Sequence, residues 1–189
     1  MTVQPAPKTQ ELGNKINNFF NNCLRPNNFD IRLLKKEAGN LIKIDAADAY
    51  NYLGLIAALE NNREAVISNY ENAIKNASNN YTINLNYSIA LSHCGLNDLA
   101  LEKARENFKM FPNDKYVFQE LCNRLLCTAR FNEVSKLLYA NEDSKQLQLI
   151  NHATEIFEAA NLTDDEAQNL QTLAYSVITK NNLYYFYHI

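Results

Sequence analysis

The chain has 189 residues, 47% of them hydrophobic and 21% charged, and this length and composition suit one globular domain. Nucleic acid and anionic membranes attract proteins that carry an excess of positive charge. The formal net charge of −3 therefore argues against both as partners. Gly and Pro number only four each, so the sequence contains few strand and turn signals. No apolar run approaches the length of a membrane span.

The N-terminal part of the sequence predicts a lead-in and a pair of helices. Pro5 and Pro7 predict that residues 1–8 form a disordered lead-in, and this polar segment lacks the apolar core of a secretion signal. Helical periodicity is present in residues 9–24 and 30–44, with an Arg-Pro-Asn-Asn turn between them. The apolar residues of the second segment include Ile31, Leu33, Leu34, Ala38, Leu41 and Ile42. We expect residues 9–46 to form a helix pair that caps a longer stack.

The sequence then repeats every 34 residues, in units 47–80, 81–114 and 115–148. Each unit carries two stripes of apolar or small residues at helical spacing, formed in the first unit by Tyr50, Leu53, Gly54 and Ala57 and then by Val66, Tyr70 and Ala73. Small residues mark the offsets where paired helices approach closely: Gly54, Ser88 and Cys122 at one, and Val66, Ala100 and Val134 at another. Neither helix can bury its stripe alone, so each pair packs on the next and builds a curved helical rod with a concave face.

Turn segments begin at Asn61, Gly95 and Ala129, again 34 residues apart, where the two helices of each unit must reverse direction. Beyond the repeats, residues 149–182 keep helical periodicity, so we expect about eight helices in all. Residues 183–189 are aromatic and β-prone. Two explanations stay open for this ending: the tail packs against the last helices, or the native chain is longer and the tail begins a truncated region.

The pattern resembles the tetratricopeptide repeat family, whose units carry an aromatic residue, a Leu-Gly pair, a second aromatic, an Ala with an aromatic four residues on, and a closing Pro. The matching residues are Tyr50, Leu53, Gly54, Val66 and Tyr70 in the first unit and Tyr87, Ala100 and Pro112 in the second. The sequence departs from the pattern at Ala57, Ser78, Asn84 and Gln146. The resemblance implies an all-α fold, a right-handed α-solenoid of antiparallel helix pairs, in which the first helix of each pair lines a concave groove.

The sequence shows no catalytic constellation. His93 and Cys94 are adjacent, so on a helix they point about 100° apart and cannot form a base–nucleophile contact. His152 and Glu155 have a metal-ligand spacing, but a lone pair of this kind is more often a surface contact. The four cysteines lack a C-x-x-C motif and are typical of core residues in a reducing compartment. We therefore predict a cytoplasmic non-enzyme without catalytic residues, cofactor, bound metal or small-molecule substrate.

The groove positions implied by the resemblance are Asn51 and Leu55 in the first unit, Leu85, Asn86 and Ile89 in the second, and Tyr116, Gln119 and Asn123 in the third. For Leu55, Ile89 and Leu126, packing between repeats is an equally good interpretation. In the family's best-defined binding mode, Lys, Arg and Asn clamp the terminal carboxylate of a chaperone tail. Here only Asn86 matches, because Asn51, Tyr116 and Glu120 stand where the cations are expected, so we predict no carboxylate clamp.

These residues predict a protein–protein interaction scaffold, adaptor or chaperone-like module that binds a peptide segment of another protein through amide groups and apolar contacts. The alternative is a regulatory or antitoxin-like subunit that binds a folded partner through its convex face or its aromatic C-terminus. A third hypothesis is an enzyme domain whose catalytic part is missing from the chain.

Overall fold

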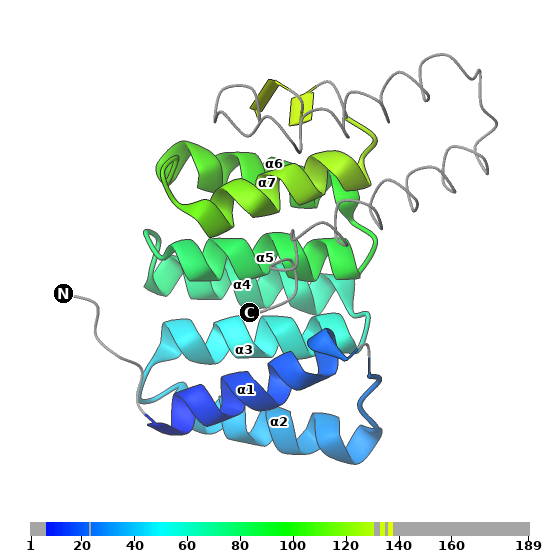
Figure 1. Cartoon of the computed structure of the whole chain (residues 1–189). Coiled ribbons are helices and arrows are strands. Elements are labelled where there is room, and N and C mark those ends of the chain that lie inside the picture. Colours follow the sequence, from blue (N-terminus) through cyan, green and yellow to red (C-terminus); the bar gives the residue numbers. More distant parts are fainter. Residues whose placement is uncertain (1–6, 23, 131–132, 135, 138–189) are drawn as a thin grey trace.

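Seven α-helices in chain order make up the described part of the protein. The structure is a computed structural model of the whole chain, and it describes residues 7–22, 24–130, 133–134 and 136–137. The helices are α1 (Pro7–Asn21), α2 (Asn28–Leu41), α3 (Ala46–Leu59), α4 (Arg63–Asn76), α5 (Tyr81–His93), α6 (Asn97–Met110) and α7 (Lys115–Cys127) (Figure 1). This part of the chain contains no strand. The predicted all-α fold is thereby confirmed.

Polar side chains that precede the helices explain where most of them begin. The N-terminal caps of α2, α3, α4, α5 and α7 are Asn27, Asp45, Asn62, Asn80 and Asp114, whose side-chain oxygens accept backbone N–H bonds from the first turn. At α2 the cap is a capping box, because Asp30 accepts the backbone N–H of Asn27 at 3.2 Å. Helix α1 begins at Pro7, earlier than the expected start at residue 9, because proline suits the first helical position.

The turns inside the three predicted repeats share one backbone conformation. Asn61, Gly95 and Ala129 all have positive φ, at 54°, 73° and 55°. In each turn the next residue donates its backbone N–H to a carbonyl five residues back: Asn62 to Ala57 at 2.9 Å, Leu96 to Leu91 at 2.9 Å, and Arg130 to Leu125 at 2.8 Å. This is the Schellman motif, which ends a helix with one left-handed residue. The 34-residue period of the sequence is therefore also a period of the backbone.

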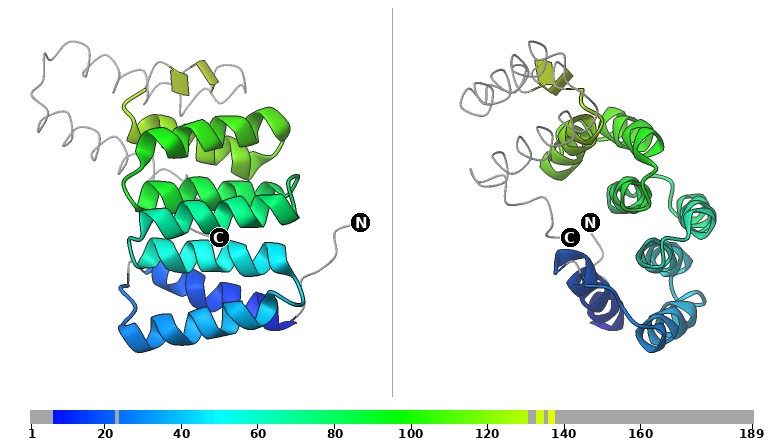
Figure 2. Two further views of the ribbon diagram at one scale, coloured as in Figure 1. Left: turned by 180° about the vertical axis from the view of Figure 1, so that it is seen from behind. Right: turned by 90° about the vertical axis from the view of Figure 1, so that its right-hand side faces the viewer.

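The helices form two curved layers. Helices α1, α3, α5 and α7 contact one another in succession and make the inner layer. Helices α2, α4 and α6 pack against the inner helices, but among the described residues they do not contact one another. Helices that touch in one layer and are separated in the other must follow an arc, with the touching layer inside, as the right-hand view of Figure 2 shows. The inner layer is thus the concave side, while the right-handed twist of a solenoid stays a prediction.

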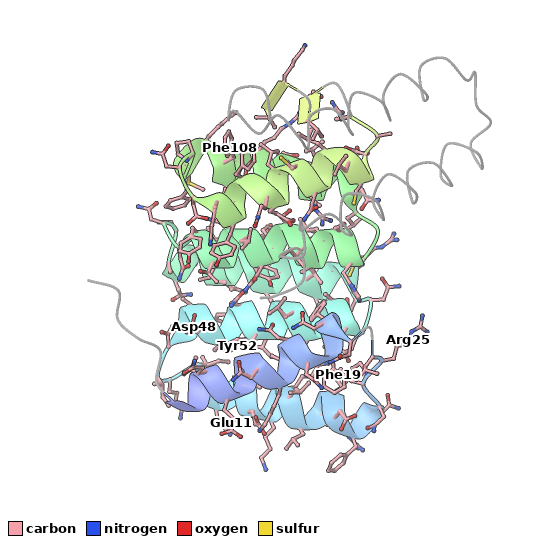
Figure 3. All side chains as sticks on the ribbon, in the orientation of Figure 1. Glu11, Phe19, Arg25, Asp48, Tyr52 and Phe108 are labelled. Carbon is pink, nitrogen blue, oxygen red and sulfur yellow. The ribbon has the colours of Figure 1, made fainter. Side chains whose placement is uncertain are left out.

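Within the inner layer, Tyr52 of α3 joins this helix to α1. The Tyr52 hydroxyl donates to the carbonyl of Thr9 at 3.0 Å, and its side chain lies between α3 and α1 in Figure 3. Gly13 makes room for the ring, since a Cβ at this position would lie 3.1 Å from the hydroxyl oxygen. Burial raises the pKa of Tyr52 to about 12, so the hydroxyl keeps its proton and remains a donor.

Small residues allow the paired helices to approach closely, as the sequence predicts. In the first unit a Cβ added to Gly54 would lie 2.5 Å from Cε2 of Tyr70. Tyr70 is fully buried and stacks on Tyr87, with ring centroids 4.7 Å apart. Ser88 and Cys122, at the same repeat offset, are also buried. The space that a side chain would need at Gly54 therefore belongs to the Tyr70 ring.

We expect Ala100→Leu to lower the free energy of unfolding by roughly 1–3 kcal/mol. Ala100 of α6 is completely buried, and its carbonyl oxygen lies 3.1 Å from Ser88 Oγ of α5, so added methyl groups must push the two helices apart. The midpoint of urea-induced unfolding, followed by circular dichroism, measures the change. An unchanged midpoint would show that the repeat register is misassigned.

Some expectations concern residues outside the described ranges. These are most of the lead-in (residues 1–6), the helices over 149–182 and the aromatic tail 183–189. The third predicted repeat is described as far as residue 137, with α7 as its first helix. Across the described helices, none has the length and apolar character that a bilayer crossing requires.

Candidate protein-binding surface on helices α3, α5 and α7

The residues predicted to line a groove lie on three successive helices of the inner layer. Helix α3 carries Asn51 and Leu55, α5 carries Leu85, Asn86 and Ile89, and α7 carries Tyr116, Gln119 and Asn123. Tyr116 is exposed, Ile89 and Gln119 are half-buried, and the others are buried. Leu126, like Leu55, is buried and so belongs to the packing between helices. A partner therefore meets Tyr116, Ile89 and Gln119 before it meets the buried amides.

An amide–amide hydrogen bond joins α3 to α5. Nδ2 of Asn86 donates to Oδ1 of Asn51 at 3.2 Å, and the two residues are 3% and 4% exposed. The remaining oxygen of the pair, Oδ1 of Asn86, is buried and accepts no hydrogen bond from any described residue. An amide oxygen can accept two hydrogen bonds, and among the described residues neither acceptor position of Asn86 Oδ1 is used.

A buried ion pair and a hydroxyl join α5 to α7. Arg124 Nε lies 2.9 Å from Glu120 Oε1 on the same helix, and Ser88 Oγ of α5 donates to that oxygen at 2.7 Å. The Asn123 side chain also favours the ionised form of Glu120, while its own Oδ1 accepts no hydrogen bond from the described part of the chain. The amide pair between α3 and α5 and this group between α5 and α7 are two separate sets of contacts, and together we call them the buried polar row (Asn51, Asn86, Ser88, Glu120, Asn123 and Arg124).

The charge state of Glu120 depends on its neighbours. Burial raises the pKa of Glu120 above the usual 4.5, and the Arg124 guanidinium and the hydrogen bonds from Ser88 and Asn123 oppose that rise. The net direction is upward. Glu120 is therefore the group in this row most sensitive to the loss of a neighbouring cation.

Tyr116 is the most accessible of the predicted contact residues. It is 39% exposed in the first turn of α7, and Nζ of Lys115 lies 4.7 Å from its ring centroid. Gln119 and Asn123 follow at i+3 and i+7, so they share a helix face with Tyr116. One face of helix α7 thus carries an exposed aromatic ring, then a half-buried amide and a buried amide.

Three residues of the buried polar row were not predicted to belong to it: Ser88, Glu120 and Arg124. Ser88 was expected only as a small packing residue, and Glu120 as the replacement of a clamp cation. A signal was present, because Glu120 and Arg124 are an acid and a base at i, i+4 among apolar neighbours. Charged residues are rarely buried unless paired, so this pattern in an apolar stretch indicates a buried pair.

His93, the last residue of α5, and Cys94, which follows it, have ordinary packing environments. His93 meets Phe20 edge-on with ring centroids 5.0 Å apart, and burial lowers its pKa below the usual 6.5. Burial also raises the pKa of Cys94, although Arg63 opposes this shift. Among the described residues, no group of three or more His, Cys, Asp or Glu could hold a metal ion. His152 and Glu155 lie outside those residues.

No family model, no curated protein and no solved structure matches this chain. The likeness to tetratricopeptide repeats therefore rests on the residues, the spacing and the repeated turns described above.

Proposed function

We propose that the protein is an interaction module of the tetratricopeptide-repeat type, which holds an extended segment of a partner protein against α3, α5 and α7. The observation that carries this proposal is the row of buried amides in which Oδ1 of Asn86 and Oδ1 of Asn123 accept no hydrogen bond from the described residues. Each oxygen is suited to a backbone N–H of an extended segment, and Tyr116 and Ile89 supply apolar surface beside them. Because both oxygens are buried, their use requires a small rearrangement of side chains on binding.

The chemistry of this surface favours an internal segment over a free C-terminus. A terminal carboxylate needs charge-assisted donors to offset its desolvation. The cation within the buried row, Arg124, is already paired with Glu120. The carboxylate of Glu120 would repel the carboxylate of a peptide C-terminus. We further propose a cytoplasmic, non-enzymatic protein, in support of which the thiols of Cys94, Cys122 and Cys127 are free.

We expect Tyr116→Ala to weaken peptide binding by about 2 kcal/mol, which is about thirtyfold in Kd. The ring is the accessible aromatic anchor of the surface, and its exposure means that the stability of the fold should hardly change. Peptides of about 15 residues, selected from a random display library on the full-length protein, serve as the probe. Fluorescence anisotropy then gives Kd, which should depend little on salt because no cluster of free cations lies among the predicted contact residues.

Met110→Ala is the matched control. Met110 is 47% exposed on α6, outside the proposed surface, so its loss should leave Kd unchanged. If Tyr116→Ala binds normally while Tyr185→Ser in the aromatic tail abolishes binding, the inner-surface proposal is wrong. The regulatory-subunit hypothesis would then replace it.

A further inference from the structure

The outer face of α2 is unusually apolar for the end of a helical stack. Helix α2 packs against α1 and α3 through its buried residues Ile31, Leu34, Ala38 and Leu41. The side of α2 that points away from these two helices carries Phe29 and Leu33, which are 67% and 43% exposed. Ile44, in the turn that follows α2, is 74% exposed. The terminal unit of a helical-repeat stack normally presents a polar face to water, so this apolar stripe indicates a contact surface.

Helix α2 is the last helix at its end of the described stack. In Figures 1 and 2, α2 lies at one end of the stack of described helices, beyond α1 and α3. Among the described helices, only α1 and α3 contact it. A further helix laid along α2 would bury Phe29 and Leu33, whose i, i+4 spacing is that of helix-to-helix anchors.

Three cations accompany the apolar stripe. Arg32 and Lys36 lie one turn apart on α2, Lys43 lies in the turn that follows the helix, and all three are exposed. Within the part of the chain that the structure describes, none of the three forms an ion pair. By contrast, Lys35 of the same helix pairs with Glu60 at 2.8 Å. The outer face therefore combines an apolar stripe with a positive edge on a protein of net charge −3.

We propose that this α2 outer face (Phe29, Arg32, Leu33, Lys36, Lys43 and Ile44) binds an amphipathic helix of a partner protein whose apolar stripe is flanked by Asp or Glu. The apolar stripe supplies buried area, and the cations select an acidic partner and fix its register. A second copy of this chain does not fit, because pairing two such faces would bring like charges together. The surface is separate from the one on α3, α5 and α7, so it adds a second binding activity to the proposed function.

A library of helical peptides tests this assignment. The probe is a display library of about 20 residues per peptide, with Leu fixed at the a and d heptad positions and the other positions randomised. Selection on the full-length protein, with counter-selection on Phe29→Ser/Leu33→Ser, should enrich Asp and Glu beside the Leu stripe. Relative to the wild type, we expect Kd for an enriched peptide to rise about tenfold or more in Phe29→Ser/Leu33→Ser and about tenfold in Lys36→Glu/Lys43→Glu.

Two control variants separate this face from the inner surface. Met110→Ser removes a comparably exposed apolar side chain from α6, and Tyr116→Ala removes the anchor of the inner surface; both should bind the enriched peptides as the wild type does. The inference is overturned if no peptide is enriched, or if enriched peptides lack an acidic bias and bind Lys36→Glu/Lys43→Glu equally well. Absence of enrichment together with Lys36- and Lys43-dependent binding to phosphatidylserine vesicles would assign the face to an anionic lipid surface instead.

Discussion

Gly54→Ala should lower the free energy of unfolding by about 3 kcal/mol, near the upper end for overpacking a core with one methyl group. The added Cβ would lie 2.5 Å from Cε2 and 2.7 Å from Cδ2 of Tyr70. The ring cannot move aside freely, because Tyr70 is fully buried and stacked at 15° on Tyr87. Urea-induced unfolding, followed by circular dichroism, measures the loss.

Gly39→Ala is the matched control for this variant. Gly39 lies within α2, and nothing stands within 4 Å of the Cβ that alanine would add there. Alanine favours the helix over glycine by about 0.5–1 kcal/mol, so this variant should be more stable than the wild type. If both glycine variants shift the urea midpoint in the same direction, the close approach of Gly54 to Tyr70 is not what limits this position.

Arg124→Met should lower the free energy of unfolding by about 3–5 kcal/mol at neutral pH, because it leaves the Glu120 carboxylate buried without its cation. The double variant Glu120→Gln/Arg124→Met removes both charges and should recover about half of that loss or more. A double-mutant cycle in urea gives the coupling between the two residues. Losses that simply add in the double variant would show that the ion pair does not link them.

The stability of the single variant Arg124→Met should depend on pH, and the direction of this dependence follows from the pKa of Glu120. The pKa of Glu120 is raised above 4.5 in the folded protein, and removal of Arg124 raises it further. A carboxyl group of this kind favours the folded state while it is protonated, and that contribution is lost as the pH rises through the folded pKa. The deficit of Arg124→Met relative to the wild type should therefore be small below about pH 4.5 and grow toward neutral pH. A deficit of equal size below about pH 4.5 and at neutral pH would contradict a buried, ionised Glu120.

Local patterns made most of the helical architecture predictable. The turns at Asn61, Gly95 and Ala129 could be placed because turn residues and helical periodicity act over a few positions. The start of α1 could not be placed from the sequence. Proline usually indicates a break in a helix, but it also suits the first helical position, where Pro7 stands.

The candidate surfaces were less predictable, because exposure depends on neighbouring helices. Leu85 and Ile89 lie one turn apart on α5, yet Leu85 is 7% exposed while Ile89 is half-buried. Leu33 was grouped with the apolar residues of its helix, but it points away from the core that Leu34 enters. Periodicity shows that such residues belong to a helix. Which face of that helix is covered by a neighbouring helix depends on tertiary packing.

The contacts of α3 have a consequence for communication between the two proposed surfaces. Among the described helices, α3 is the one that contacts both α2 and α5. In a stack where each unit touches only its neighbours, local opening spreads from one unit to the next. An occupant of α2 that restrains the fluctuations of α3 therefore also lowers the entropy lost when a segment orders α3 and α5. We therefore expect occupation of one proposed surface to strengthen binding at the other through this helix, without any change of fold.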